Sequence, residues 1–196
     1  MRRLILTAAL LVGLTAPAWA DFESGLAAYI RGDYETALRE FTALAEQGKA
    51  EAQFNLGVMY HIGEGVPRDY VQAMQWYRLA AEQEHIGAQY NLGLMYAKGQ
   101  GVSQDHVEAA NWYRRAAEQN DGISQSTLGI MYTKGYGVPQ DFVRAHMWLS
   151  LAASNLSPGY DHDTAVRNRE YVISLMTPAE IAEAQQLARK WKPTKE

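Results

Sequence analysis

Three consecutive blocks of 36 residues, starting at Glu51, Gly87 and Ile123, carry the same residue types at the same offsets. The first two blocks share 20 of their 36 positions, and 14 positions are identical in all three, which is too many for chance. A period of this length is typical of repeat architectures in which one unit cannot bury its apolar side alone. The repeat therefore predicts a solenoid, a stack of similar units that share one continuous core.

Each block contains two helical patterns. In the first block, apolar residues follow Ala52 at i+4, i+7 and i+8, and a second set follows Ala73 at i+3, i+4, i+7 and i+8. Each set marks one stripe of an α-helix, and we call these helices A and B. Helix B carries Trp76, Trp112 and Trp148 at the 36-residue period, which favours a core role over a row of sugar-stacking rings. The predicted fold is all-α, a right-handed α-solenoid of antiparallel helical hairpins.

Glycines recur inside helix A and between the two helices. Gly57 and its copies lie within helix A, where glycine costs about 1 kcal/mol relative to alanine, so we expect helix B to approach there too closely for a β-carbon. The connector holds a pair of glycines that can supply positive φ, followed by Asp69 as a helix N-cap. In the second block, Asp105 and Glu108 match the capping-box pattern. The connector lacks the lysine and Ser/Thr of a phosphate-binding loop.

The first twenty residues have the features of a cleaved secretory signal peptide. Arg2 and Arg3 precede an apolar run over residues 4–14, and the segment closes on Ala18-Trp19-Ala20. The apolar run is shorter than the ~20 residues that a membrane helix needs. We therefore expect export by the general secretory route with cleavage near Ala20, which places the protein in the periplasm or outside the cell.

Charge and cysteine content limit the classes of partner and the means of stabilisation. The formal charge of the chain is −4, and removal of Arg2 and Arg3 with the signal peptide leaves −6. An acidic surface disfavours a nucleic-acid partner. The chain contains no cysteine, so an exported protein must be stabilised by packing alone. No later segment is long and apolar enough to predict a membrane span.

The sequence divides into six parts. Residues 1–20 are the signal peptide, 21–49 a degenerate tetratricopeptide-like hairpin, and 50–85, 86–121 and 122–157 the three repeats. Residues 158–196 are predicted to form C-terminal capping helices, because Ser157-Pro158-Gly159 interrupts the chain and Thr177-Pro178-Ala179-Glu180 has the residues of a strong helix start. We expect the apolar face of this last helix to cover the exposed flank of the third repeat.

The pattern L-G-x-M-Y-x-x-G-x-G-V-x-x-D-x-V-x-A-x-x-W, from Leu56 to Trp76 and twice again, resembles the Sel-one-like repeat. This repeat is the branch of the tetratricopeptide superfamily with a glycine-containing loop. The resemblance implies a scaffold or adaptor that holds other proteins, although a fold alone defines no single activity. Some secreted, cysteine-rich relatives are associated with penicillin binding and weak β-lactamase activity, and this chain differs from them by having no cysteine.

The resemblance also implies a binding surface, because the superfamily lines its concave side with the stripe of helix A that faces away from the core. In this chain the candidate partner-binding residues are Phe54, Asn55, Val58, His61, Tyr90, Asn91, Leu94, Lys98, Thr127, Ile130 and Lys134. The apolar row formed by Val58, Leu94 and Ile130 has two interpretations. It either seals the seam between neighbouring hairpins or forms the floor of a groove for an extended or helical peptide.

No other chemistry is predicted. The five histidines show no pair at metal-ligand spacing, and the chain has no G-x-S-x-G or S-x-x-K motif. We therefore expect no catalytic residue, metal or cofactor, and a non-catalytic scaffold in the bacterial envelope that binds a protein or peptide through the concave helix A surface. Two alternatives stay open, namely an envelope enzyme or enzyme regulator acting on peptidoglycan or β-lactams, and a structural adaptor of exopolysaccharide or secretion machinery.

Overall fold

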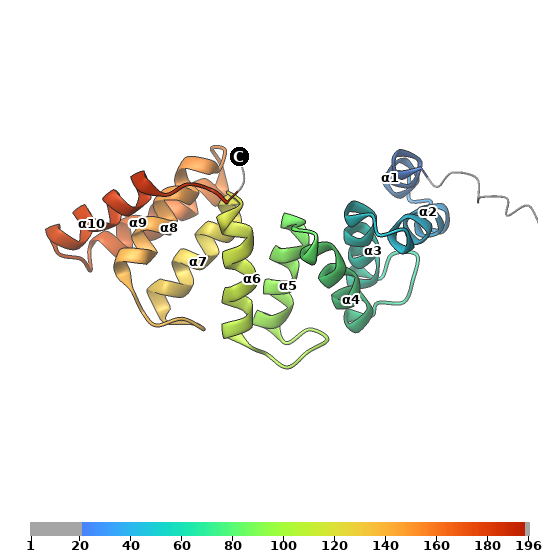
Figure 1. The fold of residues 1–196 in the computed structure, drawn as a ribbon, viewed down its shortest axis with the longest axis horizontal. Coiled ribbons are helices and arrows are strands. Elements are labelled where there is room, and N and C mark those ends of the chain that lie inside the picture. Colours follow the sequence, from blue (N-terminus) through green and yellow to red (C-terminus); the bar gives the residue numbers. More distant parts are fainter. Residues whose placement is uncertain (1–20, 195–196) are drawn as a thin grey trace, which may run out of the picture.

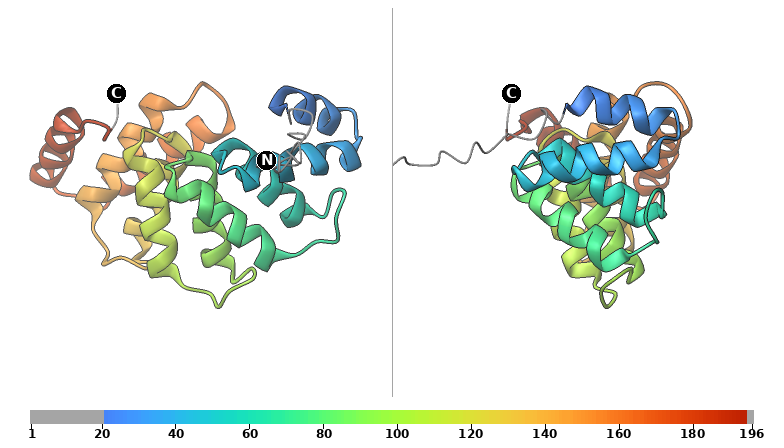
Figure 2. Two further views of the ribbon diagram at one scale, coloured as in Figure 1. Left: turned by 45° about the vertical axis from the view of Figure 1, so that its right-hand side comes forward. Right: turned by 90° about the vertical axis from the view of Figure 1, so that its right-hand side faces the viewer.

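The computed structural model describes residues 21–194, and the predicted signal peptide lies outside the described residues. Within this range the chain forms ten α-helices and no strand: α1 (Phe22–Ile30), α2 (Tyr34–Glu46), α3 (Ala50–Ile62), α4 (Tyr70–Glu82), α5 (Ile86–Lys98), α6 (His106–Glu118), α7 (Gly122–Lys134), α8 (Phe142–Asn155), α9 (Tyr160–Ile173) and α10 (Pro178–Lys190). The helices stack in an arc, with α1 near one end and α10 at the other (Figure 1 and Figure 2). The prediction of an all-α solenoid of helical hairpins is confirmed.

Helices A of the three repeats are α3, α5 and α7, and helices B are α4, α6 and α8. From α1 to α9, each helix packs against the next helix along the chain. Helix B of one hairpin therefore lies between its own helix A and helix A of the following hairpin. This arrangement lets each unit bury on its neighbours the apolar stripe that it cannot bury alone.

The core is built from apolar residues of both helices, with alanines where the helices approach most closely. Ala73, Ala80 and Ala81 are fully buried on α4, and Leu56 and Met59 are buried on α3. Helix B packs close to helix A, as the recurring glycine predicted. A β-carbon on Gly57 would lie 2.7 Å from the ring of Tyr77, and one on Gly93 or Gly129 would be equally crowded by α6 or α8. The tryptophans differ, since Trp112 and Trp148 are buried and Trp76 is half-buried.

The glycine-containing connector turns the chain between helices A and B. Gly63 ends α3 with φ of 88° and is followed by a second glycine with positive φ. Asp69 then caps α4, because its Oδ1 accepts hydrogen bonds from the backbone N–H groups of Val71 at 2.9 Å and Gln72 at 3.0 Å. Both features were predicted from the sequence. Asp105 caps α6 in the same way, and Asp141 caps α8 by accepting one hydrogen bond from the backbone N–H of Arg144.

The expected capping box at α6 is not formed. Asp105 caps the helix, but the carboxylate of Glu108 accepts a hydrogen bond from Nδ2 of Asn111 at 3.1 Å and does not return to the N-cap. Asn111, one turn further along the helix, therefore binds the Glu108 carboxylate that the capping box would need. The reciprocal box is complete at α10, between Thr177 and Glu180, where the sequence also predicted a helix start.

The two ends of the stack are closed differently. At the amino end, the carboxylate of Glu64 in the first glycine connector accepts hydrogen bonds from the hydroxyl groups of Tyr29 and Tyr34, which ties the first hairpin to the first repeat. Burial and this carboxylate raise the pKa of Tyr29 to about 12. At the carboxyl end, α9 takes the place of a further helix A, and α10 folds back onto α8 and buries Ala184. The predicted cover of the last hairpin is therefore present.

A membrane-spanning helix would need a long apolar stretch. Over residues 21–194, each helix is too short or too polar to cross a bilayer.

Candidate functional site

The eleven candidate residues lie on α3, α5 and α7, and we call them the helix A face. Phe54, Asn55, Val58 and His61 are on α3, Tyr90, Asn91, Leu94 and Lys98 on α5, and Thr127, Ile130 and Lys134 on α7. Nine of them are half-buried, and the two lysines are exposed. The stacking of hairpins therefore leaves part of every one of these side chains accessible.

Three members of the face mainly fill the seam between hairpins. The ring of Phe54 stacks on the imidazole of His85, the N-cap of α5, with 4.5 Å between ring centroids. A β-carbon on Gly87 would lie 3.1 Å from the same ring, so α5 begins directly beside Phe54. Val58 and Tyr90 also pack against the central core cluster. For these three residues the structure favours the seam-sealing interpretation.

Leu94 and Ile130 have fewer apolar neighbours than these three residues and lie outside the core. Both are half-buried, and neither belongs to the core clusters of the described chain. Ile130 borders a hollow of about 100 Å³ that it shares with Asn168 and Tyr171 of α9. The capping helix therefore approaches the far end of the apolar row without covering it completely.

Two of the three polar side chains Asn55, Asn91 and Thr127 form hydrogen bonds within their own helices. The Nδ2 group of Asn55 donates to the carbonyl of Glu51 at 2.7 Å, and the hydroxyl of Thr127 donates to the carbonyl of Ile123 at 2.9 Å. Asn91 makes no side-chain hydrogen bond within residues 21–194. Asn91 and the adjoining Leu94 therefore offer the most available polar and apolar groups at the centre of the face.

Positive charge gathers where helices A end. Lys98 and Lys134 are the last residues of α5 and α7 and are exposed. His61, near the end of α3, packs nearly perpendicular to the ring of Tyr70 at 5.3 Å. Burial lowers the pKa of His61, and Lys98 and Arg68 lower it further, so the imidazole is neutral at pH 7. This basic edge is set by the two lysines.

A cleft lies at the opposite edge, where helices A begin. Its volume is about 620 Å³, and its walls come from the starts of α5, α7 and α9 and the turns before them. Ile86, Ile123 and Tyr160 are exposed apolar residues of this cleft. Burial raises the pKa of the adjacent Tyr90, and the carboxylates of Asp121 and Asp161 raise it further, so the cleft edge is acidic. The helix A face thus runs from a basic edge to an acidic cleft.

The sequence analysis missed this cleft because turns, which carry no periodic signal, supply most of its walls.

The sequence analysis also assigned no role to a glutamine that is identical in all three repeats. Buried Gln89 donates from Nε2 to the carbonyl of Ala81 at 3.3 Å and accepts from Nε2 of Gln119 at 2.8 Å. The equivalent bonds join Gln53 to Ala45 and Gln83, and Gln125 to Ala117 and Asn155. We call these bonds the glutamine ladder, which links each repeat to the preceding hairpin. The sequence signal for it was a glutamine identical in all three repeats, followed 30 residues later by a second amide side chain.

Metal chemistry finds no support in the described part of the chain. Within residues 21–194, histidine and acidic side chains do not gather in groups of three or more that could hold a metal ion. The buried His146 lies with its Nδ1 3.4 Å from the hydroxyl of Ser150. Burial is the main cause of its lowered pKa, with Arg169 contributing. His146 is therefore a neutral core residue.

Comparison with known proteins identifies the repeats. The helical hairpins define an α-solenoid of the tetratricopeptide type, and the Sel1 repeat model matches residues 50–85, 86–121 and 123–155. The chain therefore belongs to the Sel1 repeat family, which confirms the resemblance seen in the sequence. Proteins of this family are generally scaffolds for protein–protein interactions.

Two solved structures are similar to the chain. One is a protective antigen present in uropathogenic Escherichia coli strains that displays an SLR fold, with 34% identity and a TM-score of 0.71, where the match covers 80% of this chain and 32% of that one. The other is a Sel1 repeat protein from Oxalobacter formigenes, with 34% identity and a TM-score of 0.69, covering 76% and 57%. The chain thus spans about a third and somewhat over half of these two proteins. Among curated proteins, no sequence matches.

Proposed function

We propose that this protein is an exported, non-catalytic scaffold of the bacterial envelope, which binds a segment of a partner protein through the helix A face. The observation that carries the proposal is the position of Leu94 and Ile130. These apolar side chains are half-buried outside the core clusters, on two helices whose first turns line a cleft of about 620 Å³. Apolar anchors beside a concave cleft are the usual basis of peptide recognition.

The charges of the face favour one orientation of a bound segment. Lys98 and Lys134 would attract acidic side chains of the partner at the end of helices A. Asp121 and Asp161 would attract basic ones at the cleft. Such paired charges fix direction and raise the association rate more than they raise affinity, while the apolar anchors supply most of the binding energy.

The hairpins themselves favour binding without large rearrangement. Each of the three repeats is linked to the preceding hairpin by the glutamine ladder, and a connector glycine packs against that hairpin, so the face is ordered before a partner arrives. A preorganised surface loses less conformational entropy when it binds. Export with cleavage near Ala20 would bring this surface to partners in the periplasm or outside the cell.

The proposal predicts that acidic substitutions in the apolar row abolish binding. We expect the double variant Leu94→Asp, Ile130→Asp to lose its partners in affinity capture from periplasmic extract, because each carboxylate would be desolvated against an apolar partner surface. Circular dichroism should show an unchanged helix content, since both side chains are partly accessible. The matched control is Ile30→Asp, an apolar residue of α1 that is 75% exposed, which should capture the same proteins as the native chain. A folded double variant that captures them in equal yield would refute the proposal.

A further inference from the structure

The three equivalent tryptophans of helix B differ in what covers them. The indole of Trp148 is covered by Trp191 from the C-terminal tail, with 6.1 Å between ring centroids at 70°, and Trp148 is 6% exposed. The guanidinium of Arg115 lies 4.7 Å from the ring of Trp112, which is 8% exposed. Trp76 is half-buried, and no ring or cation of the described chain stacks on it. The position that Arg115 holds in the second repeat is Leu79 in the first.

The segment that covers Trp148 is the chain's own C-terminal tail. After α10 the chain becomes extended and runs back to the end of α6 (Figure 1). Thr194 donates to the carbonyl of Glu118 from its backbone N–H at 2.9 Å and from its hydroxyl at 3.1 Å. The tail from Trp191 to Thr194 therefore joins an aromatic contact on one helix B to backbone hydrogen bonds at the end of the preceding one.

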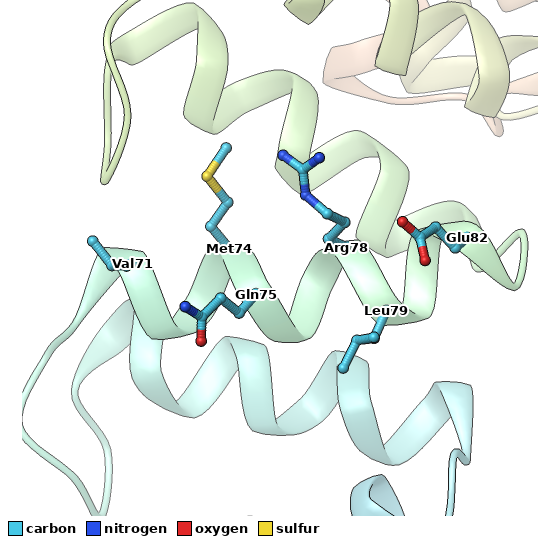
Figure 3. Close-up of a pocket in the computed structure, with 6 residues that line it drawn as sticks. All are labelled: Val71, Met74, Gln75, Arg78, Leu79 and Glu82. Carbon is cyan, nitrogen blue, oxygen red and sulfur yellow. The ribbon is translucent and has the colours of Figure 1, made fainter.

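The outer face of α4 has apolar residues where α8 has them, but without a cover. Val71 and Leu79 occupy the positions of Val143 and Leu151, and they are 51% and 44% exposed. Leu151 is partly buried in the last core cluster together with Trp191. A hollow of about 380 Å³ lies along α4 beside this face, lined by Val71, Leu79 and four further residues but not by Trp76, and Figure 3 shows its side chains spreading to the two sides of the helix. On α6 the position equivalent to Leu79 is Arg115, so this face of α4 is more apolar than that of α6.

Charge favours a basic occupant. The tail that reaches Glu118 carries Arg189, Lys190 and Lys192, all exposed. Glutamate occupies the position of Glu118 in the two preceding helices B as well, at Glu46 of α2 and Glu82 of α4, and both are exposed. The tail contacts Glu118 through its backbone carbonyl, and the surface across α2 and α4 repeats that helix end with its exposed glutamate, together with the tryptophan and the apolar positions.

We propose that the outer face of α2 and α4 around Trp76 is a second docking surface, which binds a basic, extended segment of a partner protein that carries a tryptophan. The partner's indole covers Trp76 and contacts Leu79, as Trp191 covers Trp148. Its basic residues lie beside Glu46 and Glu82. This surface lies on helices B and is independent of the helix A face.

The test uses a fluorescently labelled synthetic peptide with the sequence of residues 187–196 as the probe, titrated into the full-length mature protein. We expect saturable binding that weakens about tenfold when the tryptophan of the peptide is replaced by alanine, which corresponds to one aromatic contact. The variant Leu79→Arg places a guanidinium where Arg115 lies in the second repeat. It should cover Trp76, retain the fold because Leu79 is 44% exposed, and weaken peptide binding by at least the same factor.

Two further variants make the result specific. Glu82→Gln should weaken binding less than Leu79→Arg and reduce its salt dependence, because it removes one exposed charge. Leu94→Asp, on the helix A face, should leave peptide binding unchanged, so failure here and failure of the helix A proposal are separate results. Absence of saturable binding, or binding that Leu79→Arg leaves intact, would overturn the second docking surface.

Discussion

Replacement of Gly137 by alanine is expected to lower the free energy of unfolding by about 2–4 kcal/mol, through backbone strain and overpacking together. Gly137 has φ of 66°, where a side chain is strained. A β-carbon there would lie 1.9 Å from the carbonyl oxygen of His106, an atom of the helix backbone that cannot rotate away. The connector between α7 and α8 would have to move off the start of α6, which would open the contact between two repeats.

A matched control separates the two causes. Gly48 also has positive φ, at 84°, but a β-carbon there would meet nothing within 4 Å. Gly48→Ala should therefore cost only about 1 kcal/mol, the conformational part of the effect. The measurement is the urea midpoint followed by circular dichroism at matched concentration. Equal losses in the two variants would mean that the crowding at Gly137 contributes nothing, contrary to this expectation.

Replacement of Gln89 by leucine should cost about 1–3 kcal/mol, because it removes two hydrogen bonds of a buried side chain, each worth about 0.5–1.5 kcal/mol. The side chain of Gln89 is 1% exposed and joins the carbonyl of Ala81 to the amide of Gln119. Leucine has a similar volume, so the lost hydrogen bonds dominate the loss. We expect a lower urea midpoint and faster hydrogen exchange at the junction of α4 and α5.

The control for this variant is Gln104, which likewise donates to a carbonyl near the end of a helix, here α5. Its Nε2 group lies 2.7 Å from the carbonyl of Ala97, but the site is exposed, so water can replace the bond. Gln104→Leu should cost no more than about 1 kcal/mol, the usual net value of one hydrogen bond. If Gln89→Leu were as mild as this control, the glutamine ladder would not be a major link between hairpins.

The sequence predicted the helices and their contacts within each repeat because these depend on spacings that recur. Gly57 marks the close approach of helix B, and Asp69 marks the start of α4, since each acts on neighbours a few residues away or one helix across. The capping box predicted at Glu108 is absent for a local reason, because the carboxylate accepts a hydrogen bond from Asn111 instead of from the N-cap. Periodicity alone does not show which of two local hydrogen bonds forms.

Contacts between repeats and at the ends could not be predicted in the same way. The return of the tail to Glu118 joins residues 76 positions apart, and no periodic pattern connects Thr194 with the end of α6. On the helix A face, spacing placed Phe54 and Leu94 on equivalent stripes, but it did not show that His85 stacks on Phe54. Whether a residue of that stripe seals a seam or stays accessible depends on the next hairpin, which differs between repeats.

Site-specific photo-crosslinking in intact cells tests the central claim of partner binding by the helix A face most directly. A photoreactive phenylalanine analogue replaces Leu94 in one strain and Ile30 in another, and both proteins are recovered under denaturing conditions. We predict that position 94 yields a discrete adduct with a partner polypeptide and that position 30 does not. The same adduct from both positions, or none from position 94, would contradict the claim that this face is where the partner binds.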